Sequence, residues 1–367
     1  MSTSAFDNQE MKINILVTGG AGFIGGACIR SLLKKTKFKI FNLDKLGYAS
    51  DLTSINNVLA IHGNDMQDRY EFIKGDLTNI DEVKEAIKKS NPDIVIHFAA
   101  ESHVDRSIDN SGVFIDSNIV GTHNLLNVLL QHYEKLTGWR REGFRFHHVS
   151  TDEVFGSLGS EGSFNEDTKY DPRSPYSASK AASDHLVRAW FHTYDFPILL
   201  TNCSNNFGPW QFPEKLIPVV VNKALNLEHI PLYGNGLNVR DWLYVEDHID
   251  AILLVLSKGV IGKSYCIGGM GEKSNIEIVN DICSIMDKLK PRKEPYQSLI
   301  RKVADRPGHD FRYSIDSSLI QKDLGWIPKF ETYEALELTV KWYIQNQEWC
   351  SLLSKKSGYK GERIGIK

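Results

Sequence analysis

The 367-residue chain has no long apolar run, no closely spaced cysteine pair and no strong excess of one charge. No apolar stretch approaches the ~18 residues that a membrane-spanning helix needs, so we expect no membrane span. The first ten residues are polar and lack the apolar centre of a secretory signal. A net charge of -3 gives no electrostatic basis for binding nucleic acid or an anionic membrane.

Cysteine is scarce as well, with five residues at wide spacing. An odd number of isolated cysteines is typical of buried free thiols in a reducing compartment rather than of a disulfide framework. Of the twelve histidines, the adjacent pair His147 and His148 lies on a predicted strand, where neighbouring side chains face opposite ways. We therefore expect a cytoplasmic protein without a metal site.

What the sequence does contain is an ordinary globular composition, 41% hydrophobic and 24% charged. Short β-branched runs alternate with longer amphipathic stretches, which predicts an α/β fold with a Rossmann-type, doubly wound parallel sheet. The predicted strands cover residues 13–18, 39–43, 93–98, 144–150 and 197–202. The predicted helices cover residues 23–35, 81–89, 117–136 and 175–194.

The pattern changes after residue 202, where the next sixteen residues are rich in Asn, Pro and aromatic side chains. We interpret them as an irregular segment that faces a substrate, followed by shorter elements and glycine turns. The predicted organisation is a Rossmann domain over residues 11–202, a smaller C-terminal α/β domain over residues 203–350, and loose tails at residues 1–10 and 351–367. Residues 239–265 are predicted to return to the first domain.

Residues 19–25 have the spacing G-x-x-G-x-x-G between a predicted strand and a predicted helix. Such a turn lets the backbone approach a pyrophosphate, and the helix N-terminus supplies amide donors. Residues 156–162 repeat the spacing but precede no apolar helix, so we interpret them as a loop. Asp44 ends the second predicted strand, where a carboxylate binds the ribose diol of NAD and disfavours the 2′-phosphate of NADP; Lys45 weakens this preference slightly. The alternative is a glycine turn with a structural role only.

Further strand ends agree with a dinucleotide pocket. Asp76 follows a third strand, where the adenine would lie, and Ala99 and Ala100 leave room for a cofactor after the strand at residues 93–98. Each feature alone is unspecific. Their order along the chain matches the order that a Rossmann sheet requires.

Tyr176 and Lys180 lie four residues apart on a helix that we expect to begin at Pro175 after the N-cap Ser174. A phenol is a poor base at neutral pH, but a nearby ammonium favours the phenolate, which can take a proton from a substrate alcohol. The similar pair Tyr70–Lys74 lies on a predicted strand, where four residues span ~13 Å. We predict that Tyr176 and Lys180 are catalytic; the alternative is a surface tyrosine on an amphipathic helix.

Together these features resemble the extended short-chain dehydrogenase/reductase family, over about residues 12–350. Within that family, residues 150–156, with the adjacent acids of Ser-Thr-Asp-Glu-Val-Phe-Gly, resemble the dTDP-glucose 4,6-dehydratases. Residues 99–107, 202–218 and 305–313 are similar to the same enzymes. The resemblance implies a Rossmann domain that binds NAD, a smaller domain that binds a sugar nucleotide, and dTDP-glucose as the substrate.

The resemblance also implies which residues bind. Cofactor contacts are expected from Gly19, Gly22, Phe23, Ile24, Gly25, Asp44, Lys45, Asp76, Leu77, Ala99, Ala100, Ser102, Ser117, Tyr176, Lys180 and Asn206. Substrate contacts are expected from Ser102, His103, Thr151, Asn205, Lys215, Leu216, Pro231, Tyr233, Arg240, Asn275, Asp305, Arg306, His309 and Tyr313. The two arginines among them suit bidentate contacts with phosphate.

The acidic pair Asp152 and Glu153 follows a predicted strand, at the edge where open α/β sheets bind ligands. Removing water from a sugar requires a base and an acid, and two carboxyls can divide these roles if burial and like charge raise one pKa. By resemblance, Tyr176 takes the C4 hydroxyl proton while NAD takes the hydride, Glu153 removes the C5 proton, and Asp152 protonates the departing C6 hydroxyl. Thr151 would bind the C4 oxygen, and Lys180 completes the catalytic set; the alternative is a solvated acidic turn.

Two other functions remain open at this point. One is a sibling enzyme, a UDP- or CDP-sugar dehydratase or a decarboxylase on the same scaffold. The other is a non-catalytic NAD-binding protein, against which the intact Tyr176, Lys180 and acidic pair argue. The resemblance further implies a homodimer through a four-helix bundle built from the helices at residues 117–136 and 175–194.

Overall fold

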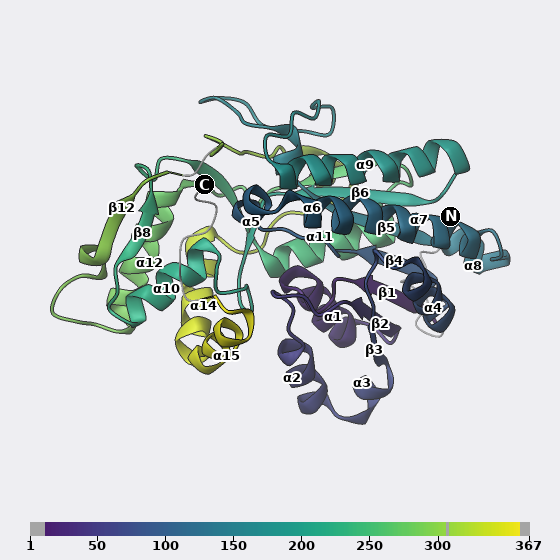
Figure 1. Cartoon of the computed structure of the whole chain (residues 1–367), viewed down its shortest axis with the longest axis horizontal. Coiled ribbons are helices and arrows are strands. Elements are labelled where there is room, and N and C mark those ends of the chain that lie inside the picture. The colour runs from purple at the N-terminus through teal and green to yellow at the C-terminus, as the bar shows by residue number, and fades with distance from the viewer. Residues whose placement is uncertain (1–11, 306–307, 360–367) are drawn as a thin grey trace.

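A computed structural model describes residues 12–305 and 308–359 (Figure 1). Its central sheet contains seven parallel strands in the order β10-β6-β5-β4-β1-β2-β3, which confirms the Rossmann-type prediction. The order reverses between β1 and β4, and ligands bind at such a reversal, outside the carboxyl ends of the strands. The strands are β1 (Asn14–Thr18), β2 (Lys39–Asp44), β3 (Tyr70–Lys74), β4 (Ile94–His97), β5 (Arg145–Thr151), β6 (Ile198–Cys203) and β10 (Ser264–Ile267).

Helices cover both faces of this sheet, because the strands are apolar on both sides. Ile15 packs in one apolar cluster with Leu32, whereas its neighbour Leu16 packs in another cluster with Leu125. Within the described residues, none of these helices is long and apolar enough to cross a membrane. One face carries α1 (Phe23–Lys35), α2 (Thr53–His62) and α11 (Val245–Lys258); the other carries α4 (Ile80–Ser90), α7 (Gly121–Tyr133) and α9 (Pro175–Tyr194).

The C-terminal part forms a separate, smaller α/β layer with its own apolar core, at the left of Figure 1. The chain leaves this layer after β9, runs through α11 against α1, and adds β10 to the edge of the central sheet beside β6. Its strands are β7 (Asn205–Phe207), β8 (Ile230–Tyr233), β9 (Val239–Tyr244), β11 (Glu272–Ser274) and β12 (Ile300–Val303). Its helices are α10 (Leu216–Leu225), α12 (Asn275–Leu289) and α14 (Thr332–Gln345).

The prediction of a loose tail from residue 351 is wrong for residues 351–359. Helix α15 (Gln347–Ser357) packs against the loop after β2: Trp349 Nε1 donates to Asp51 Oδ2 at 2.9 Å and Lys356 Nζ donates to the Ser50 carbonyl at 3.2 Å. The segment is polar overall, so its composition gave no indication of the few side chains that attach it to the rest of the protein. Residues 1–10 and 360–367 lie outside the described residues.

The helix predicted at residues 117–136 differs at its start. A π-helix, η1 (Ile115–Val120), lies between α6 (Ser111–Phe114) and α7. Wider π-turns are frequent at functional sites, and here Asn118 accepts a hydrogen bond from the Glu101 amide at 2.8 Å and donates to its carbonyl at 3.0 Å. Hydrophobic periodicity does not distinguish a π-turn from an α-turn, so the sequence carried no sign of it.

Candidate active site

A pocket opens at the carboxyl ends of strands β1 to β6. It is lined by the loops and helix starts that follow these strands. Every residue predicted to contact the cofactor lines this pocket, and so do the five predicted catalytic residues. The structure thus brings together side chains that come from six separate strand ends. Their binding and catalytic roles stay predictions at this point.

The glycine turn between β1 and α1 is shaped for close backbone approach. Gly19 has φ +72°, and a Cβ atom there would meet the Ala99 backbone nitrogen at 2.6 Å. A Cβ atom at Gly25 would lie 2.3 Å from the Gly19 carbonyl oxygen. No side chain caps the N-terminus of α1, and Phe23, Ile24 and Gly25 line the pocket. This turn therefore fits a pyrophosphate held by the helix N-terminus.

Asp44 is fixed in place at the end of β2. Its carboxylate accepts hydrogen bonds from the amides of Ala21 at 3.0 Å and Leu46 at 2.7 Å, and from Ser50 Oγ at 3.0 Å. Burial raises the pKa of Asp44, while these donors oppose the shift. A carboxylate held this way in the pocket wall suits a ribose diol rather than a phosphate.

Lys45 is engaged by a neighbour rather than facing a second phosphate. Its Nζ lies 3.0 Å from Glu101 Oε1 and donates to Ser117 Oγ at 3.4 Å. This pairing removes the small contribution that Lys45 was expected to make toward NADP. Asp76 and Leu77, after β3, line the same end of the pocket.

Helix α9 begins as predicted, with Ser174 in a capping box with Ser177 and Pro175 in the first turn. This start places Tyr176 and Lys180 in the pocket wall, both buried. Burial raises the pKa of Tyr176 well above its ordinary value; the Glu153 charge adds to this and a hydrogen bond with Thr151 opposes it. Lys180 Nζ donates to the Val149 carbonyl at 3.0 Å.

The acidic pair occupies the short 3-10 helix η2 (Asp152–Phe155) after β5. Asp152 is 1% exposed, and burial, with the charges of Glu153 and Asp241, raises its pKa well above the ordinary value. Among the described residues, its Oδ2 atom has no hydrogen-bond partner. Glu153 is half-buried in the same wall. Asp152 is thus able to keep its proton at a higher pH than an ordinary aspartate, as a general acid requires.

Four of the predicted substrate residues line the pocket directly: Ser102, Thr151, Asn205 and Lys215. Lys215 Nζ donates to the Ser102 carbonyl at 3.3 Å, so this contact crosses from the C-terminal layer to the loop after β4. His103, next to Ser102, is buried beside Glu214 rather than in the pocket wall.

The other predicted substrate residues belong to the C-terminal layer, and two of them, Arg240 and Tyr313, interact electrostatically with the acidic pair. The Arg240 guanidinium packs 4.4 Å from the centre of the Tyr313 ring and donates to the Asp310 carbonyl at 3.0 Å. Its charge lowers the pKa of Asp152, opposing burial, which places Arg240 close to the catalytic end. Arg306 lies outside the described residues. The remaining members of this group are Leu216, Pro231, Tyr233, Asn275, Asp305 and His309.

Sequence reasoning missed a cluster that crosses the pocket, formed by Tyr48, Arg106 and Glu214. Tyr48 OH donates to Glu214 Oε1 at 3.0 Å, and Arg106 Nε and Nη2 donate to Glu214 Oε2 at 3.1 and 2.9 Å. The Arg106 guanidinium lies 4.0 Å from the centre of the Tyr48 ring. These three side chains tie the loop after β2 to the C-terminal layer. Arg106 lies within one of the motifs discussed above, but nothing in the local pattern pairs it with Glu214.

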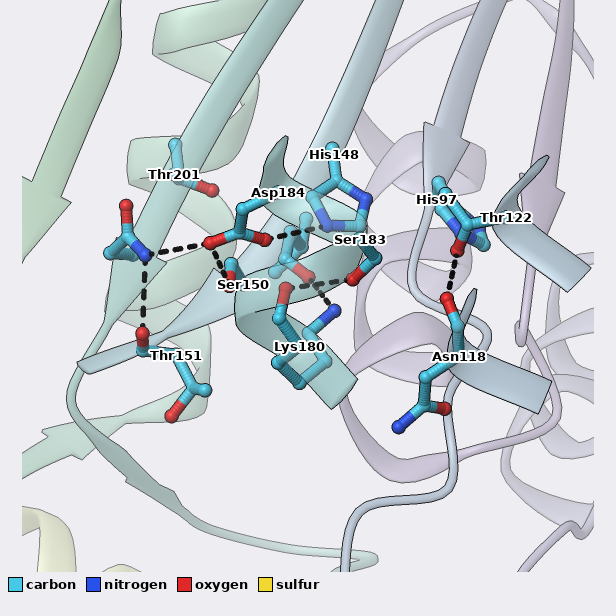
Figure 2. A network of polar contacts seen from close by, with 12 residues as sticks. His97, Asn118, Thr122, His148, Ser150, Thr151, Lys180, Ser183, Asp184 and Thr201 are labelled. Atoms are coloured by element: carbon cyan, nitrogen blue, oxygen red, sulfur yellow. Dashed lines mark hydrogen bonds and ion pairs between the residues drawn. The ribbon is translucent and has the colours of Figure 1, made fainter. Parts of the chain in front are cut away.

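Asp184 was missed as well. It lies behind the pocket on α9, where its carboxylate contacts His148 at 2.9 Å and Ser150 at 2.7 Å (Figure 2). A spacing of four from Lys180 was the available signal. His147 bonds Thr201 at 3.0 Å, so each member of the histidine pair has a partner within the fold. In the described ranges, the acidic, histidine and cysteine side chains form no group of three that could hold a metal.

Comparison with known proteins gives consistent matches over almost the whole chain. Residues 16–339 match the sequence family described as GDP-mannose 4,6 dehydratase. The chain is 48% identical to the dTDP-glucose 4,6-dehydratase of Neisseria meningitidis serogroup B, over 96% of this chain and 98% of that protein.

Solved structures agree. A dTDP-glucose 4,6-dehydratase from Bacillus anthracis in complex with NAD superposes with a TM-score of 0.80 and 41% identity, over 93% of this chain and 99% of that one. One from Streptomyces venezuelae, also with NAD bound, gives a TM-score of 0.82 and 40% identity, over 92% and 99%.

Proposed function

The chain belongs to the family described as GDP-mannose 4,6 dehydratase, in which its relatives are dTDP-glucose 4,6-dehydratases, and we propose that it converts dTDP-glucose to dTDP-4-keto-6-deoxyglucose and water. It is an NAD-dependent nucleotide-sugar dehydratase, a lyase of deoxysugar biosynthesis. One observation carries this proposal beyond a simple dehydrogenase: the acidic pair stands beside Tyr176, with Asp152 buried so that its carboxyl favours the protonated form.

Bound NAD would supply a hydride acceptor for C4 of the sugar and, once reduced, a hydride donor for C6, so that no net oxidation would occur. The chain's own residues manage the protons. Tyr176 takes the proton of the C4 hydroxyl at its phenolic oxygen, and the Lys180 ammonium favours the phenolate state that can do so. Thr151, whose side chain bonds Tyr176, is suited to hold the C4 oxygen.

The elimination of water falls to the acidic pair. Glu153 removes the C5 proton, which becomes acidic once C4 is a ketone, and Asp152 delivers a proton to the C6 hydroxyl oxygen as it leaves. Glu153, now protonated, returns a proton to C5 when the hydride reaches C6, which completes the 4-keto-6-deoxy sugar. Burial of Asp152, more complete than that of Glu153, supports this division because burial favours the neutral, proton-donating form.

The diphosphate and base of the substrate are assigned to the C-terminal layer. Arg240, whose charge acts on Asp152, and Lys215, in the pocket wall, supply positive charge, and Tyr313 supports the Arg240 guanidinium. Arg240 donates to backbone carbonyls in this structure, so a bound diphosphate would replace at least one of those contacts. The other predicted substrate residues of this layer complete the assignment.

The test uses the full-length protein as isolated, incubated with dTDP-glucose and no added NAD. The 4-keto product absorbs in the ultraviolet after alkaline treatment, and UDP-glucose run in parallel tests the nucleobase. Product from UDP-glucose alone would contradict the proposed substrate.

We expect Asp152→Asn and Glu153→Gln to reduce bound NAD transiently but to release no 4-keto-6-deoxy sugar, whereas Glu161→Gln, in the exposed loop 156–162, should behave as wild type. Normal product formation by both site variants would overturn the assignment.

We also propose that two copies of the chain associate through α7 and α9. Three large apolar side chains are exposed on the adjoining segment: Val113 at 41%, Ile115 at 50% and Val120 at 41%. The segment packs directly against α9, so one continuous face would be covered by a second copy. Val120→Glu should halve the molecular mass measured by light scattering. Ile327→Glu, at an exposed position elsewhere, is the control and should leave the mass unchanged. If the Val120→Glu variant remained a dimer, the dimer would not form through this surface.

We propose a cytoplasmic location because the cysteine thiols are not paired in disulfides. All five cysteines are free and buried, as is typical of a reducing compartment. Slow modification of the native protein by a thiol reagent, followed by rapid modification of five thiols on unfolding, is the expected result. Fast labelling before unfolding would contradict the burial.

A further inference from the structure

Asp184 stands in one row with the catalytic pair of α9. Tyr176, Lys180 and Asp184 follow one another at intervals of four, so they share the helix face that packs on the sheet. The reaction proposed above uses the first two and leaves the third without a role. The Asp184 side chain is 0% exposed, and an ionised carboxylate at such a depth is costly unless charges and donors compensate it.

Donors surround the carboxylate. His148 Nε2 contacts Oδ1 at 2.9 Å and Ser150 Oγ donates to Oδ2 at 2.7 Å (Figure 2). Tyr170 OH also donates to Oδ2, at 2.9 Å. Burial raises the pKa of Asp184, but the His148 contact, the Lys180 charge and the Ser150 hydrogen bond outweigh it, so the pKa lies below its ordinary value. Asp184 is therefore a buried anion.

The same contacts join the catalytic strand to the catalytic helix. Ser150 immediately precedes Thr151 on β5. Asn202, on the neighbouring strand β6, donates both to the Thr151 carbonyl at 3.1 Å and to Asp184 Oδ2 at 3.4 Å. The end of β5 is thus anchored to α9 through Asp184, at the level where Thr151 faces Tyr176.

Lys180 lies one helical turn from the negative charge of Asp184. It is 5% exposed, and burial lowers its pKa while the Asp184 charge opposes that effect. The other titratable groups around it are Tyr176 on its own helix, His97 on β4, His148 on β5 and Cys203 on β6. Burial lowers the pKa of both histidines and raises that of the thiol, so these three groups are neutral near pH 7. Tyr176 carries a charge only as the phenolate of the proposed reaction, so Asp184 is the counter-charge present before that step.

We propose that Asp184 is a positioning residue for the hydride-transfer site: it supplies the counter-charge that keeps Lys180 an ammonium, and it anchors Thr151 against Tyr176. The proposal rests on the function assigned above to Tyr176 and Lys180. It predicts an effect on turnover and on its pH dependence, not on the fold alone.

Asp184→Asn keeps the shape and most of the hydrogen bonds while removing the charge. In the NAD-loaded, full-length enzyme we expect kcat to fall by about tenfold or more with KM changed by less than about threefold. The alkaline limb of the kcat profile should move to lower pH by about one unit, because Lys180 then loses its proton more easily. Asp93→Asn is the control: this buried aspartate bonds the Asn14 amide and Arg140 at the other end of the sheet, so the change should lower stability without moving the profile.

A charge-pair cycle separates the counter-charge from general packing. Lys180→Met removes the positive charge of the lysine while the donors around Asp184 remain, so Asp184→Asn should raise the Tm in that background while lowering it in the wild type. Equal Tm changes in both backgrounds, or an unmoved alkaline limb in Asp184→Asn, would overturn the proposal. Tyr176→Phe is assayed alongside: if it stays active, the failure lies in the proposed function itself rather than in the role of Asp184.

Discussion

Two segments of the molecule share the spacing G-x-x-G-x-x-G and do different things. Residues 19–25 run from the end of β1 into α1, and their glycines lie against the backbone that follows β4 and against the turn itself. Residues 156–162 lead into a loop, where Gly159 has open space around it. The glycine spacing is the same, but only the first copy is enclosed by a strand end, a helix N-terminus and a neighbouring strand.

Tyrosine followed by lysine four residues later also occurs twice. On α9, one helical turn brings Tyr176 and Lys180 to a single pocket wall. On β3, Tyr70 accepts a hydrogen bond from Asn42 at 3.0 Å and Lys74 lies several residues along an extended chain. The secondary structure that carries a motif, more than its letters, decides whether its members can act together.

The largest expected difference between the two glycine segments comes from replacing one glycine of each with alanine. Gly25→Ala places a Cβ atom 2.3 Å from a backbone oxygen that cannot give way, so the protein should be isolated without NAD and with activity below about 1% of wild type. Gly159→Ala should keep both. Absorbance of released cofactor and turnover of dTDP-glucose measure the difference. If Gly25→Ala retained NAD, the first segment would not be the pyrophosphate site.

The tyrosine pair offers the next largest contrast. Tyr176→Phe should lower kcat by about 10²- to 10⁴-fold, because the phenolic proton acceptor is gone. Tyr70→Phe should leave kcat within about twofold and cost about 1 kcal/mol of stability for the lost hydrogen bond. Steady-state assays with denaturant unfolding test both. Comparable kcat losses in the two variants would contradict the assignment.

Gly156 tests whether the second glycine segment also contains a position where only glycine fits the backbone. It has φ +93°, and a Cβ atom there would lie 2.6 Å from the Asp171 carbonyl oxygen. Gly156→Ala should therefore cost about 1–3 kcal/mol of unfolding free energy while bound NAD is retained. Loss of NAD at unchanged stability would mean that this loop takes part in cofactor binding.

Gly162 should give a smaller effect than Gly156. Its φ is +85°, but no atom lies within 4 Å of a Cβ atom built there. Gly162→Ala should lower stability by about 1 kcal/mol, from backbone strain alone, with unchanged kcat. A larger loss in denaturant unfolding would reveal a contact that the geometry does not contain.

The cofactor side of the site could be predicted from sequence because strand and helix alternation places its residues at one sheet edge. Asp44 and Ala99 were expected there for that reason, and Ser174 marked the start of α9. The difference in burial between Asp152 and Glu153 could not be predicted, because two adjacent acidic residues give no sequence signal for which side chain the fold will bury. Nor could the contact of Glu214 with Tyr48, which joins positions 166 residues apart without any shared pattern.

The hydrogen bond between Trp349 and Asp51 has a consequence for how the protein is made. It joins residues 298 positions apart, so the loop after β2 gains its support from α15 only when nearly the whole chain has been synthesised. The glycine turn and Asp44 leave the ribosome early, yet Glu214 and then Trp349 follow much later. The pocket wall that this loop supplies, which includes Tyr48 and Ser50, therefore gains its support from a segment far along the chain.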